Sequence, residues 1–407
     1  MLPSLTGWAE VILNSLLRHT ETPPIPEAKA WIADYDGAAG PSIDCSQAVP
    51  GYPPHPEFLE RLGRAASTRE AAGYGNILGD AALRESYAAQ VSEIVAADIR
   101  PENVAITAGC NQAFFVAVLA LAKAGQAVML PTPWYFNHKM ALDMLGIETV
   151  PLPCRAENGF VPDAEEASRH CTDKVRAIVL VTPNNPTGAV YPPGTIGAFK
   201  ELCAERGIAL VLDETYRDFI EAVEPHAGFA DGDWPETIIQ LYSFSKAYCI
   251  PGHRAGALVA SAGMVQEIAK ILDTLQICAP RAPQLVLPWA IEALADWRRR
   301  NRLEIDRRAE AFRQAMARLE GSSIGSIGAY FAYVAHPFAG MTDVEICARL
   351  ARERGLLCLP GSYFGPGQEG FLRIAFANVS AEEIAGIPAR LAAGTMPSAK
   401  RTMPSRR

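Results

Sequence analysis

One lysine, one arginine and two serines lie close together in the middle of the sequence, between two apolar runs. The segment 243–256 contains Ser243, Ser245, Lys246 and Arg254, and the runs on either side of it are typical of strands. A lysine amine can form a Schiff base with an aldehyde, and a guanidinium together with hydroxyl groups can bind a phosphate. A lone lysine is usually a solvated surface charge, but this spacing indicates a site for a phosphorylated aldehyde.

Asp213 directly follows another apolar run, residues 209–212, and is followed by Tyr216 after a short polar gap. Because an unpaired buried carboxylate is costly, Asp213 needs a partner. A helix N-terminus or a surface cation would serve, and so would a protonated aromatic nitrogen of a bound ligand. Tyr216 is either an aromatic core residue or a hydrogen-bond donor to the same ligand.

Two loops follow predicted strands, and each also has an ordinary structural explanation. Asn185 lies in the segment 182–188, whose Asn-Pro-Thr-Gly sequence is typical of a β-turn. Gly109 lies in the segment 107–112, which joins a strand to an apolar helix. Free backbone N–H groups at the start of that helix suit a phosphate, although a simple loop-to-helix connection would have the same sequence.

Aromatic and basic side chains mark two more positions. Trp134, Tyr135 and Phe136 follow a short apolar run and are either core residues or a stacking surface for a ligand. Arg373 interrupts the apolar run 371–376. A buried guanidinium demands an anionic partner, and a structural carboxylate would satisfy it.

Short apolar runs alternate with helical segments between about residues 57 and 280. Such strands, buried on both faces, indicate a mostly parallel sheet covered by helices. In such a sheet, ligand-binding groups gather at the carboxyl ends of the strands, where the motifs above lie. We expect strands at 104–107, 127–130, 149–152, 177–182, 209–213, 238–242 and 256–260. We expect helices at 112–124, 139–145 and 194–206.

The C-terminal part of the chain predicts a long helix followed by a smaller α+β unit. Residues 284–320 form one helical run with a cluster of arginines from Arg298 to Arg308. We interpret this cluster as a solvated helix face rather than a nucleic-acid patch, because acidic residues are interspersed with the arginines. In the smaller unit we expect strands at 330–334 and 371–376 and a helix at 344–354.

The composition excludes several classes of protein. The 407 residues are 49% hydrophobic and carry a formal net charge of −8, which argues against a general nucleic-acid binder. The nine cysteines are odd in number and include no Cys-x-x-Cys pair. We therefore expect neither a disulfide framework nor a metal site, and we infer a reducing, cytoplasmic location. No apolar run is long enough to span a membrane.

The spacing of the lysine segment, S-x-S-K-x(7)-R-x-G, resembles the lysine signature of the class I and II aminotransferases. These are enzymes of fold type I that depend on pyridoxal 5′-phosphate. The resemblance extends over about residues 40–390. The motifs occur in the family's order, which is Tyr74, Gly109, Asn185, Asp213 with Tyr216, Lys246, Arg254 and Arg373.

The resemblance implies three catalytic residues. Lys246 would hold the cofactor as a Schiff base and later move the proton from the substrate Cα. Asp213 would keep the pyridine nitrogen protonated, so that the ring accepts electrons. Tyr216 and Asn185 would donate hydrogen bonds to the phenolic oxygen of the cofactor.

The resemblance also implies how the rest of the cofactor and the substrate are bound. Ser243, Ser245 and Arg254 would bind the phosphate, together with backbone groups near Cys110 and Asn111. Tyr135 would stack on the cofactor ring, with Trp134 as the second choice. Arg373 would bind the substrate α-carboxylate in a bidentate pair, with Asn185 beside it.

Three further residues are interpreted from their position in the family pattern. Tyr74 would reach the phosphate in the neighbouring subunit, which implies a homodimer with shared active sites; a tyrosine in a simple turn is the alternative. Ala48 stands where the family usually has a glycine, so it either narrows the substrate pocket or is tolerated there. His138 has no visible partner for a catalytic triad and is interpreted as structural.

These residues predict a ping-pong transfer of an amino group between an L-amino acid and a 2-oxo acid. A β-lyase, a cyclase or an amino-acid oxidase on the same scaffold remains an alternative, because all would keep Lys246, Asp213 and Arg373. The substrate is left open, although the aromatic loop and Ala48 favour a neutral or aromatic one. Arg281 is not at a position where a second carboxylate-binding role follows from the pattern.

We expect a fold of the α/β class with two domains. The large domain, residues 46–283, would contain a mostly parallel sheet flanked by helices. A smaller α+β domain would be built from the N- and C-terminal segments. Residues 1–45 would form an arm and part of this small domain, residues 284–393 a linking helix and the rest of it, and residues 394–407 a disordered basic tail.

Overall fold

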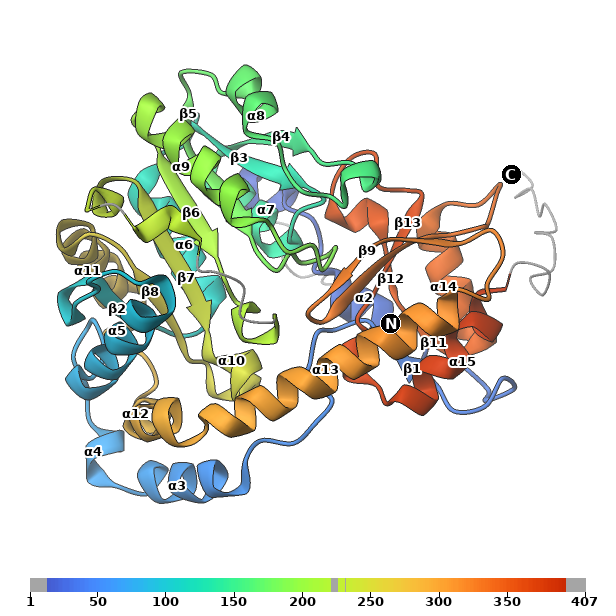
Figure 1. The fold of residues 1–407 in the computed structure, drawn as a ribbon, viewed down its shortest axis with the longest axis horizontal. Coiled ribbons are helices and arrows are strands. Elements are labelled where there is room, and N and C mark those ends of the chain that lie inside the picture. The colour runs from blue at the N-terminus through green and yellow to red at the C-terminus, as the bar shows by residue number, and fades with distance from the viewer. Residues whose placement is uncertain (1–12, 221–225, 231, 393–407) are drawn as a thin grey trace.

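The computed structural model describes residues 13–220, 226–230 and 232–392. The predicted tail at 394–407 and the first residues of the arm lie outside this part of the chain. Within it the chain forms a seven-stranded, a four-stranded and a two-stranded β-sheet, and a long helix runs from the seven-stranded sheet to the four-stranded one (Figure 1).

The larger sheet has seven strands in the order β2-β8-β7-β6-β5-β3-β4. Neighbouring strands from β7 to β4 are parallel, whereas β8 runs antiparallel to both β7 and β2. The predicted strands agree with the observed ones to within two residues at each end. The strands are β2 (Val104–Thr107), β3 (Ala127–Thr132), β4 (Glu148–Pro153), β5 (Val175–Val181), β6 (Ala209–Asp213), β7 (Ile238–Ser243) and β8 (Gly256–Val259).

Two apolar layers cover the faces of this sheet, and alternating residues of each strand face them. Val128 and Leu130 of β3 pack in one layer with α6 and α11, whereas Ala127 and Met129 pack in the other layer with α5, α9 and α12. The helices of this part are α3 (Pro56–Ala66), α4 (Arg69–Ala72), α5 (Ala81–Val95), α6 (Cys110–Leu121), α7 (Phe136–Leu145), α8 (Ala164–His170), α9 (Pro193–Arg206), α10 (Phe244–Ala247) and α11 (Ala262–Gln276).

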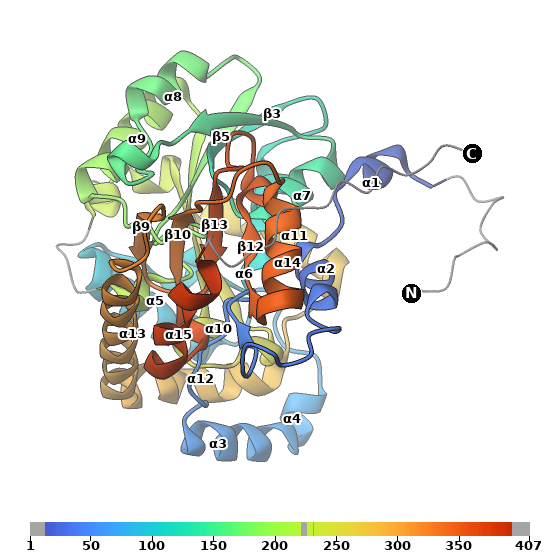
Figure 2. The same ribbon diagram turned by 90° about the vertical axis from the view of Figure 1, so that its right-hand side faces the viewer.

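The smaller sheet is antiparallel, with four strands in the order β12-β13-β10-β9. They are β9 (Ser323–Gly328), β10 (Phe331–Ala335), β12 (Leu359–Pro360) and β13 (Phe371–Ile374). Beside them the short strand β1 (Ile43–Asp44) pairs with β11 (Leu356–Leu357). The helices here are α2 (Pro24–Trp31), α14 (Asp343–Arg354) and α15 (Ala381–Leu391), whereas α1 (Ser15–His19) packs against α7 of the larger part (Figure 2).

The pairing of β1 with β11 joins the N-terminal segment to the C-terminal unit, and α2 packs against α14 in the same region. The α/β class, with a second α+β part built from both ends of the chain, is therefore confirmed. The domain boundaries at 45/46 and 283/284 stay predictions.

The prediction of a single helical run at 284–320 is wrong, because the structure has two helices in this segment. α12 (Arg281–Ala293) ends at Leu294, and α13 (Ala295–Met316) begins there. No glycine or proline marks the break, and Pro288 lies inside α12, so the sequence pattern gave no sign of it. α13 extends from the larger sheet to the smaller one and lies beside α15 (Figures 1 and 2).

The arginine cluster on α13 is only in part the solvated helix face that was predicted. Arg299, Arg300 and Arg307 are exposed, whereas Arg308 is buried and donates to the backbone oxygen of Ala377 at 2.7 Å. Arg302 lies 3.8 Å from Asp306, and Arg308 lies 2.9 Å from Glu304, both at helical spacing. Arg298 turns towards the larger sheet and pairs with Asp218 at 2.8 Å. In the described ranges, no helix has the length and apolar character needed to cross a membrane. Those ranges also contain no group of histidine, cysteine, aspartate or glutamate residues able to hold a metal ion.

Candidate active site

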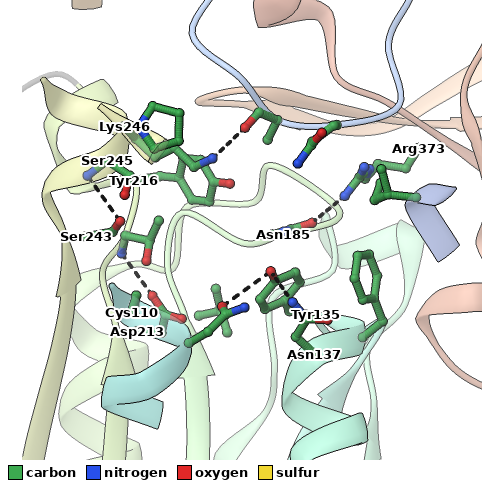
Figure 3. A pocket seen from close by; sticks show the side chains of 18 of the residues that line it. Cys110, Tyr135, Asn137, Asn185, Asp213, Tyr216, Ser243, Ser245, Lys246 and Arg373 are labelled. Atoms are coloured by element: carbon green, nitrogen blue, oxygen red, sulfur yellow. Dashed lines mark hydrogen bonds between the residues drawn. The ribbon is translucent and has the colours of Figure 1, made fainter. Parts of the chain in front are cut away.

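A cavity of about 390 Å³ lies between the carboxyl ends of the central strands and the smaller sheet (Figure 3). Twelve of the predicted site residues line it, and Tyr74 does not. They are Ala48, Cys110, Asn111, Tyr135, Asn185, Asp213, Tyr216, Ser243, Ser245, Lys246, Arg254 and Arg373.

Lys246 lies on the one-turn helix α10, directly after β7. Its Nζ atom points into the cavity and donates a hydrogen bond to the backbone oxygen of Ala48 at 2.5 Å (Figure 3). Burial, reinforced by the positive charges of Arg254 and Arg373, lowers the pKa of Lys246 from 10.5 to about 8. A substantial fraction of the amine is therefore neutral near physiological pH and able to act as a nucleophile or a base.

Asp213 ends β6 and is almost completely buried. Nε2 of His138 lies 3.2 Å from its Oδ2 atom, and the backbone N–H of Thr215 donates to its Oδ1 atom at 3.0 Å. Burial by itself would raise the pKa of the Asp213 carboxyl, but the hydrogen bonds from His138 and Thr215 outweigh it, so that the pKa lies below its usual value. The carboxylate stays ionised and faces the cavity.

His138 is the most important contact that the sequence interpretation missed. It lies in the first turn of α7, and its ring stacks on Phe114 with a centroid distance of 3.8 Å. The interpretation of His138 as structural rested on the lack of a triad partner. The structure shows instead a positioning contact with Asp213, which comes from a strand far away in the sequence. The one signal in the sequence for the contact between His138 and Asp213 is that both follow or end strands whose carboxyl ends lie at the same edge of the sheet.

The start of α6 and the segment 254–256 form a closely packed anion cradle. Gly109 precedes α6 with a φ of +88°, and no side chain caps this helix end. A Cβ atom on Gly109 would collide with the guanidinium of Arg254, and one on Gly256 would lie 2.8 Å from the backbone nitrogen of Cys110. Both positions therefore require glycine, and the close approach leaves backbone N–H groups open to the cavity.

The side chains around this cradle are suited to a phosphate. Arg254 donates to the backbone oxygens of Pro251 at 2.9 Å and Ala108 at 3.1 Å, which fixes its guanidinium beside the helix start. Oγ of Ser245 is buried without a hydrogen-bond partner, and Oγ of Ser243 accepts from the Ser245 amide at 3.3 Å. An unpaired buried hydroxyl that lines a cavity is what a missing anionic ligand would satisfy.

Arg373 projects from β13 into the opposite end of the cavity and is only 2% exposed. Its guanidinium donates to Oδ1 of Asn185 at 3.0 Å (Figure 3) and to the backbone oxygen of Ser46. Its Nε atom has no partner, and among the described residues no carboxylate lies within 4.0 Å of it. Burial lowers the pKa of Arg373 to about 10. This buried cation still needs an anion.

Tyr135 and Tyr216 line the cavity between these two ends. The hydroxyl of Tyr135 accepts a hydrogen bond from Nδ2 of Asn137 at 2.8 Å. Trp134, the second choice for the stacking residue, packs beneath Gly365 and does not line the cavity. Burial raises the pKa of Tyr216, so its hydroxyl keeps its proton and can donate it. Burial likewise raises the pKa of the Cys110 thiol, which agrees with its interpretation as a bystander.

Ala48 and Tyr74 differ in their placement. Ala48 lines the cavity, is 7% exposed and contributes its backbone oxygen to Lys246. Tyr74 is 80% exposed and contacts no part of the cavity of its own chain. Within one chain it therefore has no role in the site.

Sequence reasoning also missed much of the cavity wall. Pro23 and Ile25 come from the start of α2, and no local pattern connects them with the lysine segment. Gln47, Phe136 and Asn137 adjoin predicted residues, so sequence proximity could have found them. The remaining missed wall residues are Val181, Thr215 and Pro251.

Comparison with known proteins agrees with this arrangement. The family model of the class I and II aminotransferases matches residues 43–391. The chain belongs to the class I and II aminotransferase family. It is a pyridoxal phosphate-dependent aminotransferase that acts on amino acids and 2-oxo acids.

Similar proteins match most of the length of this aminotransferase. The aromatic aminotransferase ISS1 of Arabidopsis thaliana is 26% identical over 382 residues, which are 92% of this chain and 94% of the relative. An aspartate aminotransferase of Pyrococcus abyssi is 26% identical over 79% of this chain and 84% of the relative. The structure of Thermus thermophilus aspartate aminotransferase with maleate has a TM-score of 0.86 at 23% identity, covering 94% of this chain and 99% of the other.

The residues of the cavity fit pyridoxal phosphate. The glycine-lined cradle with Arg254 and the unpaired Ser245 hydroxyl suits its phosphate. Lys246 offers an amine that loses its proton easily, and Asp213 offers a buried carboxylate that remains charged. The cofactor's aldehyde carbon and ring nitrogen thus match the Lys246 amine and the Asp213 carboxylate.

We predict that cofactor-free aminotransferase captures pyridoxal phosphate faster as pH rises. Only the neutral Lys246 amine attacks the aldehyde, so the second-order rate should rise ~10-fold per unit well below the pKa of about 8 and level off above it. Stopped-flow absorbance at several pH values measures this rate. The exposed-lysine variant Lys270→Ala should give the same profile, whereas a midpoint near the ordinary 10.5 would contradict the burial effect.

Proposed function

We propose that this aminotransferase runs a ping-pong exchange between an L-amino acid and a 2-oxo acid, with Lys246, Asp213 and Tyr216 as its catalytic residues. One observation carries this proposal. A lysine amine of lowered pKa and a buried arginine without a carboxylate face each other across a single cavity. The first is suited to moving a proton, and the second to holding a carboxylate.

The substrate carboxylate would bind to Arg373. Because Oδ1 of Asn185 and the backbone oxygen of Ser46 already fix the guanidinium, it is preorganised for a bidentate pair. Oδ1 of Asn185 accepts a hydrogen bond from Arg373, so the side-chain NH₂ group of Asn185 is left to donate to the cofactor or the substrate. Residues 46–48 bridge from Arg373 to Lys246, so a carboxylate on Arg373 brings the substrate Cα close to the lysine.

Lys246 would first hold the aldehyde carbon of the cofactor and, once displaced by the substrate, remove the proton from the substrate Cα. Its lowered pKa keeps part of the amine neutral for this step at neutral pH. When bound, pyridoxal phosphate supplies the electron sink for the bonding pair left at Cα. Asp213, kept ionised by His138 and Thr215, would hold the proton on the ring nitrogen.

Replacement of Lys246 tests these roles. In Lys246→Ala we expect loss of the absorbance band of the lysine-bound cofactor and a fall of ~10²–10⁴-fold in the half-reaction rate with an amino donor, because no base remains at Cα. Cofactor absorbance followed after mixing with the donor measures both. The surface variant Lys270→Ala should behave as the wild type. A Lys246→Ala protein that transaminates at the wild-type rate would contradict the assignment of Lys246 as the catalytic base.

We also propose that the protein is a cytoplasmic homodimer with shared active sites. The exposure of Tyr74 supports this, because an 80% exposed tyrosine on a fixed loop is available to a second copy. The segment around it is held in place, since the Gly75 amide contacts Sγ of Cys278 at 3.4 Å. The nine free cysteines support a reducing compartment.

Hybrid dimers test the sharing of sites. We expect Tyr74→Ala to weaken the binding of pyridoxal phosphate, and Lys246→Ala to be inactive. A hybrid of the two subunits would have one site with both residues intact, so it should show about half of the wild-type activity at wild-type cofactor affinity. Titration of activity with pyridoxal phosphate measures this. If the hybrid needs as much cofactor as the Tyr74→Ala parent, Tyr74 serves its own subunit or none.

A further inference from the structure

Among the residues that the structure describes, the part of the cavity wall without an assigned role carries no charge. Lys246, Arg254, Arg373 and Asp213 are the charged residues among those that line the cavity. Each is used for the cofactor or for the substrate carboxylate. The rest of the wall is contributed largely by uncharged side chains from the start of α2, the segment after β1 and the start of α7, namely Pro23, Ile25, Gln47, Ala48, Phe136 and Asn137.

This uncharged wall lies where a substrate side chain must go. Residues 46–48 run between the two groups that define the substrate position, since Ser46 contacts Arg373 and Ala48 contacts Lys246. Ala48 and Phe136 are buried, and Ile25 is partly buried beside them. A carboxylate placed against such a surface loses its hydration without gaining a cation, whereas an apolar side chain gains by burial.

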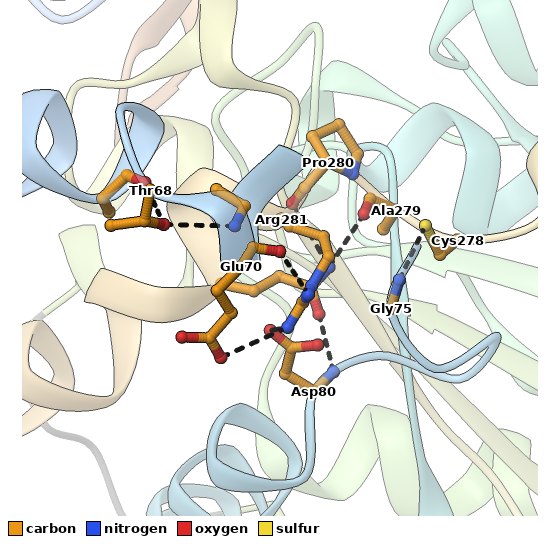
Figure 4. A network of polar contacts seen from close by, with 11 residues as sticks. Thr68, Glu70, Gly75, Asp80, Cys278, Ala279, Pro280 and Arg281 are labelled. Atoms are coloured by element: carbon orange, nitrogen blue, oxygen red, sulfur yellow. Dashed lines mark hydrogen bonds and ion pairs between the residues drawn. The ribbon is translucent and has the colours of Figure 1, made fainter. Parts of the chain in front are cut away.

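Arg281 is the arginine that the sequence motifs place closest to the substrate region. It does not supply a cation that could bind a second carboxylate of a substrate. It lies outside the cavity, where its Nη2 atom is 3.1 Å from Asp80 and 3.5 Å from Glu70 (Figure 4). Its Nη1 atom donates to the backbone oxygen of Glu70 at 2.5 Å. If a second subunit placed Arg281 at the site together with Tyr74, it would also bring Asp80 and Glu70, which pair with Arg281. These three side chains together carry a net negative charge.

We propose that the active site accepts amino donors with an uncharged, apolar or aromatic side chain and rejects those with a second carboxylate. This inference rests on the proposed function of the cavity, because it takes Arg373 as the site of the α-carboxylate. The names of the relatives leave the choice open, since they include both aromatic and aspartate aminotransferases. Lys29 is a further cation to test, because its Nζ atom lies 3.5 Å from Oε1 of Gln47, which lines the cavity.

Single-turnover half-reactions of the holoenzyme test the inference. L-Phenylalanine, L-leucine and L-methionine, each mixed with the enzyme in the absence of a 2-oxo acid, should convert the cofactor with a kcat/KM at least ~10- to 100-fold above that of L-aspartate and L-glutamate. Equal or faster conversion by L-aspartate or L-glutamate would overturn the inference alone. Conversion by no amino acid would overturn the proposed function together with it.

Three variants show whether the wall sets this preference. Ile25→Arg places a cation in the wall and should raise the kcat/KM for L-aspartate ~10-fold relative to that for L-leucine. Leu303→Arg, at a 40% exposed position on α13, is the matched control and should leave the ratio unchanged. Lys29→Ala should also leave it unchanged. A ratio that stays constant in Ile25→Arg, or a loss of L-aspartate conversion confined to Lys29→Ala, would contradict the assigned wall.

Discussion

The burial of the Arg373 guanidinium without a carboxylate is the constraint on which the arrangement of this protein depends. A buried cation is tolerated only if hydrogen bonds and an anion compensate its lost hydration. Asn185 from the larger sheet and Ser46 from the N-terminal segment supply the hydrogen bonds. The guanidinium therefore links the small sheet, the large sheet and the segment after β1. The anion that it still lacks would be the carboxylate of the substrate.

The other charges of the cavity follow from the same electrostatics. Its wall contains three cations and one carboxylate, an excess that matches a ligand with a phosphate and a substrate with a carboxylate. Two of those cations lower the pKa of Lys246 further than burial does alone. His138 and Thr215 counter the effect of burial on Asp213. Burial and the neighbouring cations thus set the ionisation state of Lys246, and hydrogen bonds from His138 and Thr215 set that of Asp213.

Local sequence patterns predicted most of the large sheet, and together with the family resemblance they named twelve of the residues that line the cavity. Asp213 is the last residue of β6, Lys246 comes three residues after the end of β7, and Asn185 comes four residues after the end of β5, so strand ends and turn residues point to them. The Pro23 and Ile25 wall, the contact of His138 with Asp213 and the pairing of β1 with β11 depend on residues far apart in the sequence. The break at Leu294 was missed because it contains no helix-breaking residue. These four features depend on tertiary packing, which a local sequence pattern does not report.

The attachment of the cofactor to Lys246 is the central claim, and chemical trapping tests it directly. The holoenzyme would be reduced with borohydride, which makes the bond between amine and aldehyde carbon permanent, and then digested and analysed by mass spectrometry. The account predicts one pyridoxyl group per chain on the peptide that contains Lys246, and loss of the label when excess amino donor is added before reduction. A label on another lysine, or one that amino donors do not remove, would contradict it.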